Sequence, residues 1–265
     1  METKSYRSIF ISDIHLGTKH CKADYLCEFL KYNDCEKLYL VGDIIDGWKL
    51  RKKFYWPQSH SNVIRRVLTK AKRHTRIYYV LGNHDEELRK WITHYKLKFG
   101  KIRIVNEVIH ESADKRLYLV THGDVFDGIT RLAPWITWMG DNAYHFVLWI
   151  NTWYNRIRKW MGLKYWSMSK FLKHNVKKAV DFVFEFEKNI TNYCRKRGYD
   201  GVICGHIHTP EIKDIDGVTY MNDGDWVESC TALVEHHDGR FELIHWKDID
   251  HDSDVQYDEG DETIK

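Results

Sequence analysis

Five short polar motifs stand directly after apolar, strand-like runs of this sequence, and their residue types are those that bind metal ions. In chain order the motifs are SDIH, GD, GNHD, THGD and GHIH, and they contain Asp13 and His15, Asp43, Asn83 and His84, His122, and His206 and His208. Carboxylate oxygen mixed with imidazole nitrogen suits metals of the borderline class, such as Mn, Fe and Zn. In D-x-H and H-x-H, the spacing of two residues points both side chains to the same side of an extended backbone. The sequence therefore predicts a metal site built from loops.

The set of candidate ligands suffices for two metal ions. We assign Asp13, His15 and His208 to one ion, Asn83, His122 and His206 to the other, and Asp43 to a bridge between them. Only two of these ligands are anionic, so two divalent cations leave a positive centre that suits an anionic phosphate. A two-metal site can activate water and stabilise both oxygens of an in-line displacement. Each motif alone is also ordinary loop chemistry, so the metal interpretation depends on all five occurring in order.

Apolar runs that alternate with helical patterns must position these motifs. Strands are expected near residues 8–12, 37–41, 76–81, 102–105, 108–111, 117–121, 202–204, 211–215, 218–222, 231–236 and 241–246, and helices near 25–32, 62–74 and up to about 95. The alternation of strands and helices predicts a layered α/β architecture. Asp-Gly pairs at 216–217 and 238–239 predict hairpin turns. The C-terminal strands are therefore expected to form a β-meander that completes a mixed sheet.

Composition divides the chain into four predicted parts. The core is expected in residues 1–128 and 199–246, an aromatic, basic and helical insertion or lid in 129–198, and an acidic tail in 247–265. Between residues 142 and 180 there is no Asp or Glu. The tail has eight acidic residues and few apolar ones, a composition typical of disordered segments.

Bulk properties argue against several classes of protein. The N-terminus lacks an apolar run of signal-peptide length, which predicts a cytoplasmic protein. The six cysteines contain no C-x-x-C pair and are expected to be free thiols. A net charge of +3 is too mild to indicate nucleic-acid binding. The longest uncharged run of the insertion, residues 142–155, is shorter than the roughly 20 residues that span a bilayer. The sequence does not specify an oligomeric state.

The order D-x-H, G-D, G-N-H-D, H, G-H-x-H resembles that of the calcineurin-like metallophosphoesterases over about residues 8–132 and 201–246. The resemblance implies a four-layer α/β/β/α sandwich, a dinuclear Mn, Fe or Zn centre, and hydrolysis of a phosphate ester or anhydride. It gives ligand roles to the same seven positions, namely Asp13, His15, Asp43, Asn83, His122, His206 and His208. It gives His84 a role beside the phosphate without binding metal.

A second carboxylate in the stretch GDIIDG, Asp46, is a candidate partner of His84. An Asp that accepts the other ring N–H of His84 would set its tautomer and favour the protonated form that a general acid needs. The resemblance implies the same pairing. The alternative is that Asp46 is a turn or cap residue.

The insertion is the part of the sequence that bears on the substrate. Trp149, Trp153, Ile157 and Trp160 recur at helical spacing, and the next predicted helix, residues 165–188, carries Lys170, Lys173 and Lys177 as candidate substrate-binding residues. The aromatic face can pack on the core. It can also form a lid or membrane-surface element, and the lysines can face a diphosphate or anionic lipid.

A core of this kind with a helical, apolar lid is similar to the UDP-2,3-diacylglucosamine pyrophosphatases of lipid A synthesis. The similarity implies a Mn-dependent enzyme at the cytoplasmic face of the inner membrane, which cleaves a lipid-linked nucleotide sugar to UMP and a lipid monophosphate. Those enzymes typically have Arg after the ligand Asn, whereas this chain has His84, which places it in a paralogous branch.

Two other classes of function stay open at this point. One is a soluble phosphodiesterase or phosphatase with an unrelated substrate, in which the insertion is an ordinary cap. The other is a non-catalytic binding module with a phosphoesterase fold. The retention of all seven candidate ligands argues against the module, because a scaffold has no need of them.

Overall fold

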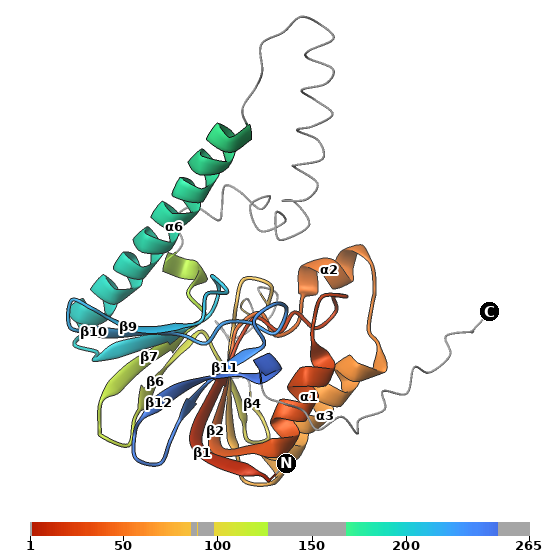
Figure 1. The fold of residues 1–265 in the computed structure, drawn as a ribbon. Helices are drawn as coiled ribbons and strands as arrows, with labels where there is room; N and C mark the ends of the chain where they lie inside the picture. Colours follow the sequence, from red (N-terminus) through yellow and green to blue (C-terminus); the bar gives the residue numbers. More distant parts are fainter. Residues whose placement is uncertain (1, 86–88, 90–97, 127–167, 249–265) are drawn as a thin grey trace, which may run out of the picture.

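The computed structural model describes residues 2–85, 89, 98–126 and 168–248, and the side chains of the last range from residue 181 onward. The elements are β1 (Lys4–Ile11), α1 (Ala23–Tyr32), β2 (Asn33–Val41), α2 (Gly47–Lys52), α3 (Gln58–Lys72), β3 (Arg76–Val80), β4 (Lys98–Phe99), β5 (Ile102–Val105), β6 (Glu107–Glu111), β7 (Leu117–Thr121), η1 (Asp124–Phe126), α6 (Met168–Arg197), β8 (Gly201–Cys204), β9 (Glu211–Ile215), β10 (Val218–Asn222), β11 (Thr231–Glu235), β12 (Phe241–His245) and η2 (Trp246–Asp248). Figure 1 shows their arrangement.

Several predictions fall on parts of the chain outside the described residues. These are the helix expected up to about residue 95, the aromatic residues Trp149, Trp153, Ile157 and Trp160, the side chains of Lys170, Lys173 and Lys177, and the tail from residue 249. The boundaries at 128/129 and 198/199 likewise stay predictions.

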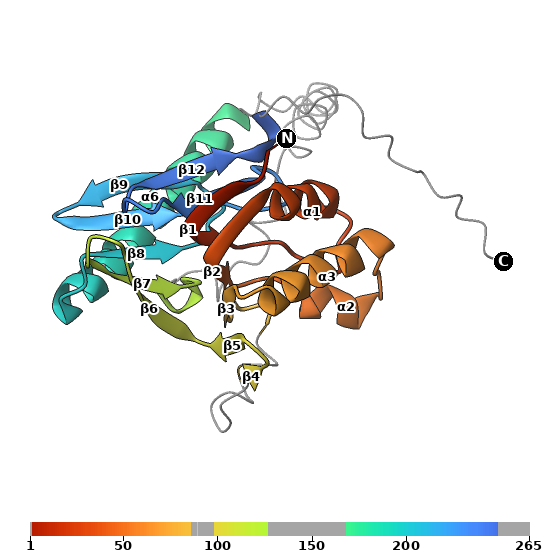
Figure 2. The ribbon, with the colours of Figure 1, turned by 90° about the horizontal axis from the view of Figure 1, so that it is seen from below.

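The first sheet has the strand order β12-β11-β1-β2-β3-β5-β4. Strands β1, β2, β3 and β5 are parallel, and β11 runs antiparallel to β1. Strands β1 and β2 end in continuous buried runs, because helices cover one face of the sheet and a second sheet covers the other. On the outer face lie α1 and α3, which contribute Leu26, Phe29, Val63 and Val67 to the core (Figure 2).

The second sheet has the strand order β6-β7-β8-β10-β9. Its outer face is covered by α6, whose Phe186 and Ile190 pack against Val202 and Tyr220. The inner faces of the two sheets meet in a core of large side chains, Phe10, Tyr39, Val80, Tyr118, Ile203 and Met221 among them. The layers are therefore α/β/β/α, which confirms the predicted fold class. Within the described part of the chain, every helix is too short or too polar to cross a membrane.

The prediction of a single C-terminal meander was wrong. Strands β9 and β10 belong to the second sheet, whereas β11 and β12 belong to the first. The Asp-Gly turns do join two antiparallel hairpins, as their left-handed glycines, Gly217 and Gly239, allow. The segment between the hairpins crosses from one sheet to the other, and the backbone N–H of Trp226 donates to the carbonyl of Asp13 on the way (3.1 Å).

A buried carboxylate, Glu235 of β11, ties the two sheets together. Its oxygens accept hydrogen bonds from Arg7 Nη1 (2.6 Å) and Ser8 Oγ (2.8 Å), and Oε2 lies 2.9 Å from Nε2 of His110, which belongs to β6 of the other sheet. The second ring nitrogen of His110 contacts the hydroxyl of Tyr39 (2.9 Å). Burial raises the pKa of Glu235, but its contacts with His110 and Ser8 lower it overall. The resulting stabilisation is present above the unfolded-state pKa and is lost as pH falls through the folded-state value.

We expect Glu235→Ala to lower the free energy of unfolding by about 3 to 5 kcal/mol, because it leaves Arg7 and His110 without their anion. Urea denaturation at neutral pH measures this loss. The matched control is Glu242→Ala on β12, whose carboxylate pairs with the exposed Arg240. That change should cost about 0 to 1 kcal/mol. Equal losses for the two variants would mean that the buried network adds no stability of its own.

Candidate metal centre

The candidate ligands lie in loops at one edge of the two sheets. Asp13 and His15 follow β1, Asp43 follows β2, Asn83 follows β3, His122 follows β7, and His206 and His208 follow β8. Because β1, β2 and β3 are parallel, and β7 and β8 are parallel, their carboxyl ends meet. The loops of the two sheets are joined directly, since the N–H of His206 donates to Asp13 Oδ2 (2.9 Å).

The backbone at the site adopts a rare conformation. Five candidate ligands have positive φ angles, Asp13 (48°), His15 (52°), Asp43 (52°), His206 (71°) and His208 (52°). Positive φ angles are uncommon in residues other than glycine, and residues that have them cluster at functional sites. Gly42, which precedes Asp43, also has a positive φ angle (84°) and is needed for steric reasons. A Cβ on Gly42 would lie 2.4 Å from the ring of His122, so only glycine lets the β2 loop approach that ring.

Asp13, His15 and His208, which the sequence assigns to one ion, lie together. Asp13 Oδ1 is 3.1 Å from His208 Nε2 and 3.8 Å from His15 Nε2. The other oxygen of Asp13 accepts hydrogen bonds from Ser12 Oγ (2.6 Å) and the backbone of His206. Burial favours the protonated acid, but the charges of His208 and His122 hold the pKa of Asp13 well below its usual range. The carboxylate is therefore ionised, as a metal ligand must be.

Asp43 is central, as a bridging ligand would be. Its Oδ1 accepts the backbone N–H of His84 (2.9 Å). Its Oδ2 lies 3.5 Å from His122 Nε2, 3.7 Å from His84 Nε2 and 3.9 Å from His15 Nε2. Burial raises the pKa of Asp43, but the neighbouring imidazoles, His122 foremost, bring it down to about 2.

The second predicted group, Asn83, His122 and His206, contains atoms that fit a metal ion. His122 Nδ1 donates to the carbonyl of Val41 (2.9 Å), which leaves the lone pair of Nε2 directed at the site. In the described part of the chain, His122 Nε2 and Asn83 Oδ1 are buried without a hydrogen-bond partner. Buried polar atoms normally have partners, so a cation that accepts both lone pairs fits here. The ring of His206 lies 5.0 Å from that of His122.

His84 and Asp46 lie together beside this centre. Asp46 Oδ1 is 3.0 Å from His84 Nδ1, and its Oδ2 is 3.4 Å from His15 Nδ1. Asp46 also caps α2, because Oδ1 accepts the N–H of Lys49 (2.8 Å). The capping interpretation of Asp46 is therefore confirmed, and its role as the orienting partner of His84, which the 3.0 Å approach is compatible with, stays a prediction. Burial raises the pKa of Asp46, but its contacts with His15 and His84 hold it well below its usual range.

Several supporting residues were not predicted from the sequence. Asp85 accepts a hydrogen bond from the hydroxyl of Tyr79 (2.8 Å). The ring of Trp48 packs over His84 with centroids 4.2 Å apart. The spacing from Asp46 to Trp48 within one helical turn was the available signal for this contact, but the direction of the ring depends on the tertiary structure.

Most of the chain matches one protein family. Residues 6–210 match the model of a family described as calcineurin-like phosphoesterase. Similar solved structures include an archaeal phosphodiesterase, with 14% identity, 89% of this chain and 98% of that chain covered, and a TM-score of 0.41. Another is Yfce, a phosphoesterase from E. coli, with 15% identity, 90% of this chain and 98% of that chain covered, and a TM-score of 0.43. A third is Vps29 from Entamoeba histolytica complexed with Zn, with 12% identity, 90% of this chain and 98% of that chain covered, and a TM-score of 0.38. No curated protein matches this chain.

An ion pair joins the loop of His84 to the loop of His122. Arg89 Nη1 donates to Asp124 Oδ2 (2.7 Å), and Nη2 donates to the carbonyl of Leu81 (2.9 Å). Leu81 lies two residues before the candidate ligand Asn83, and Asp124 lies two residues after the candidate ligand His122. Arg89 therefore connects the two loops that carry these ligands. The pair therefore sets the spacing between the two loops.

We expect Arg89→Gln to weaken Mn²⁺ binding by about 10- to 100-fold, the range for residues that orient metal ligands. Isothermal titration calorimetry of the metal-free protein measures the change. The control is Arg116→Gln, because Arg116 pairs with Asp114 at the same kind of distance (2.6 Å) in an exposed position away from the site. Wild-type Mn²⁺ affinity in Arg89→Gln would show that this pair does not position the ligands.

Proposed function

We propose a substrate class and a general acid for this chain, which belongs to the calcineurin-like phosphoesterase family. The chain is a metal-dependent hydrolase that acts on phosphoester bonds. In our proposal the bond is that of a phosphodiester or phosphomonoester whose leaving group is an alcohol. The observation that carries the proposal is the pairing of His84 with Asp46 beside the metal centre.

The geometry of His84 suits proton donation to a leaving oxygen. One ring nitrogen faces Asp46, the other points toward Asp43 Oδ2, and Trp48 packs over the ring. Burial lowers the pKa of His84, but the contact with Asp46 and the charge of Asp43 raise it above its ordinary value. The shift favours the protonated form of the ring, which is the form that a general acid needs.

Divalent ions held by the candidate ligands would neutralise phosphoryl charge and acidify the attacking water. The protein's own part is to orient the phosphoryl group and to deliver a proton from His84 Nε2. Asp46 keeps Nδ1 protonated and the ring in place, so that Nε2 is the nitrogen that donates. We assign the ions as two Mn²⁺, since this mixture of oxygen and nitrogen ligands suits Mn and also Fe or Zn.

The leaving group distinguishes the ester from the diphosphate. An alkoxide is a strong base and needs a proton as the bond breaks, whereas a departing phosphate monoester has a second pKa near about 6 and needs little help. An Arg cannot donate a proton at neutral pH, because its pKa lies above about 12. His84, in the place where the diphosphate-cleaving relatives typically have Arg, therefore supports an ester with an alcohol leaving group.

A second candidate substrate is a lipid-linked nucleotide sugar such as UDP-2,3-diacylglucosamine. The observation that favours it is apolar exposure near the candidate ligands, since 43% of Trp48, which packs over His84, and 66% of Val125, three residues after His122, is exposed. Such side chains could contact acyl chains, with Lys170, Lys173 and Lys177 on the diphosphate. On this candidate the enzyme would act at the cytoplasmic face of the inner membrane.

We expect His84→Ala to reduce kcat by about 10²- to 10⁴-fold on a phenyl phosphodiester, the usual contribution of a general acid. On a nitrophenyl phosphodiester, whose leaving group needs less protonation, the loss should be much smaller. Asp46→Asn should reproduce part of this pattern, because Asn still caps α2 but carries no charge for His84. Unchanged turnover in Asp46→Asn on the phenyl ester would remove the dyad from the mechanism.

The two substrate candidates are separated by one assay with the Mn²⁺-loaded protein. Release of UMP from UDP-2,3-diacylglucosamine is compared with hydrolysis of soluble phosphodiesters by the same preparation. We expect the diesters to be hydrolysed with the larger kcat/KM, and His84→Ala to affect UMP release least. A much larger kcat/KM for UMP release than for every diester would reverse our order of the two substrates.

A further inference from the structure

The segment between the GD and GNHD motifs forms a basic surface on the outer face of the first sheet. Residues 47–84 contain ten Lys or Arg residues and no Asp or Glu. This segment includes α2 and α3, which lie on the same side of the first sheet as α1 (Figure 2). The catalytic chemistry uses only the ends of the segment, so most of this charge has no part in the metal centre.

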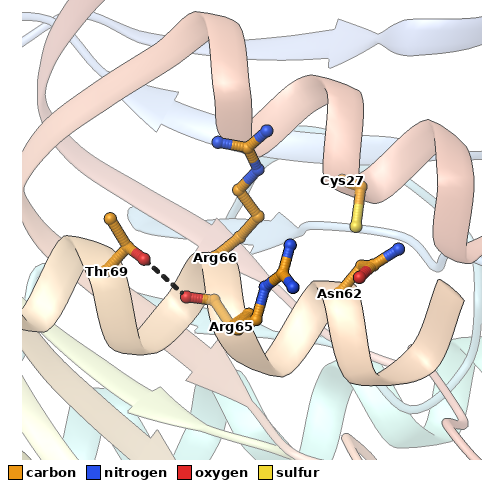
Figure 3. A pocket seen from close by; sticks show the side chains of 5 residues that line it. All are labelled: Cys27, Asn62, Arg65, Arg66 and Thr69. Carbon is orange, nitrogen blue, oxygen red and sulfur yellow. Dashed lines mark hydrogen bonds between the residues drawn. The ribbon is translucent and has the colours of Figure 1, made fainter. Parts of the chain in front are cut away.

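A groove between α1 and α3 concentrates part of this charge. It has a volume of about 270 Å³ and is lined by Cys27 of α1 and by Asn62, Arg65, Arg66 and Thr69 of α3. The four α3 residues are spaced three, one and three apart, which places them on one helical face. Figure 3 shows their side chains on the side of α3 that faces Cys27. Within the described part of the chain, the guanidinium groups of Arg65 and Arg66 are exposed and form no ion pair.

The local charges act on the thiol of Cys27. Burial, and after it the charge of Asp24, raise the pKa of Cys27 to about 11 overall, although the charges of Arg66 and Arg65 lower it. Two cations, Arg65 and Arg66, and one anion, Asp24, therefore act at this thiol. An anionic occupant of the groove would neutralise the remaining positive charge.

The described chain ends beside this groove. The last element, η2, packs on α1, where the ring of Trp246 lies 5.3 Å from that of Phe29 and its Nε1 donates to Glu28 (3.4 Å). Glu28 is the neighbour of Cys27 in α1. The last described element therefore contacts α1, the helix that contributes Cys27 to the groove. Asp250 and Asp254 lie two and six residues beyond Asp248, so they can reach at most about 7 and 22 Å from it.

Residues 249–265 have the charge that the groove lacks. They contain seven Asp or Glu residues and one Lys. Their first part is D-x-D-x-D, with Asp250, Asp252 and Asp254. In an extended chain these carboxylates lie on one side, about 6.6 to 6.8 Å apart. Two successive carboxylates can thus each meet one of the adjacent, flexible side chains of Arg65 and Arg66.

We propose that the D-x-D-x-D stretch of residues 250–254 binds the α1–α3 groove of the same chain, with its carboxylates on Arg65 and Arg66. Each contact is an exposed ion pair and weak by itself. The tether raises the effective concentration of the acidic stretch to the order of millimolar, which favours occupancy without further contacts. Salt screens the pairs over about 8 Å at physiological ionic strength, so the contact is salt-dependent.

Cys27 provides a probe of occupancy in the full-length protein, because it lines the groove. The test is the rate at which iodoacetamide alkylates Cys27 at low salt, followed by peptide mass spectrometry. The half-buried Cys21 serves as an internal reference. The triple variant Asp250→Asn, Asp252→Asn, Asp254→Asn should alkylate at Cys27 about 3 to 10 times faster than wild type, the range for two or three exposed pairs. The rate at Cys21 should not change, and high salt should remove the difference at Cys27.

The matched control is Asp258→Asn, Glu259→Gln, Asp261→Asn, which removes the same charge from the rest of the tail. It should leave the rate at Cys27 near that of wild type. Equal acceleration in both triple variants would overturn the assignment to D-x-D-x-D. An unchanged rate at Cys27 in the first triple variant would overturn the contact itself. Parallel acceleration at Cys21 would mean a general opening of the protein, which also contradicts the proposal.

A second pair of variants tests the groove side of the contact. In Arg65→Gln, Arg66→Gln, the first tail triple should no longer change the rate at Cys27, because the partners of its carboxylates are gone. In Lys52→Gln, Lys53→Gln, which removes two exposed cations of the same basic segment outside the groove, the tail effect should persist. An undiminished tail effect in the arginine variant would refute the groove as the binding site.

Discussion

The metal centre depends on two buried carboxylates, Asp13 and Asp43, that remain ionised. A buried charge is costly unless cations and hydrogen-bond donors surround it. Asp13 obtains one donor from the β8 loop, the N–H of His206, and Asp43 obtains one from the β3 loop, the N–H of His84. The bonds that make these charges tolerable therefore also join the loops. Each carboxylate keeps its second oxygen facing imidazoles, where a divalent ion can bind.

The buried carboxylate of Glu235, in contrast, has a purely structural role. Glu235 is as buried as Asp13, but Arg7, Ser8 and His110 satisfy its two oxygens completely. At the metal centre, by contrast, buried atoms of Asn83 and His122 have no partner in the described part of the chain. The contrast separates a network that holds two sheets together from one that is arranged to receive a cation.

Asp46 links the helical layer to the chemistry. Its carboxylate caps α2, contacts the ring of His84 and reaches the ring of His15. The first turn of α2 then places Trp48 over His84. The position of His84, the proton donor in our proposal, is thus tied to the start of a short helix through a carboxylate that also caps this helix.

Strands and motifs could be predicted because their signals are local. The apolar runs of β1, β3, β7 and β8 announce buried strands, and each motif follows its strand within a few residues. The start of β2 was not predicted, since the expected strand began at residue 37 and β2 begins at Asn33. Asn33 and Asp34 are polar, and they are held in place by Lys70 of α3, whose ammonium group bonds both (2.6 Å each). No apolar pattern in the sequence marks such a strand end.

The sequence by itself determined the fold class, the family and the order of the candidate ligands, because each rests on residue types within a few positions of a strand end. Only the tertiary structure decided that β9 and β10 join one sheet and β11 and β12 the other, and that Asp85 accepts the hydroxyl of Tyr79. It also decided that Arg89 meets Asp124. These choices depend on which distant segments share a buried space, and a hydrogen bond between residues far apart in the chain leaves no periodic trace in either one.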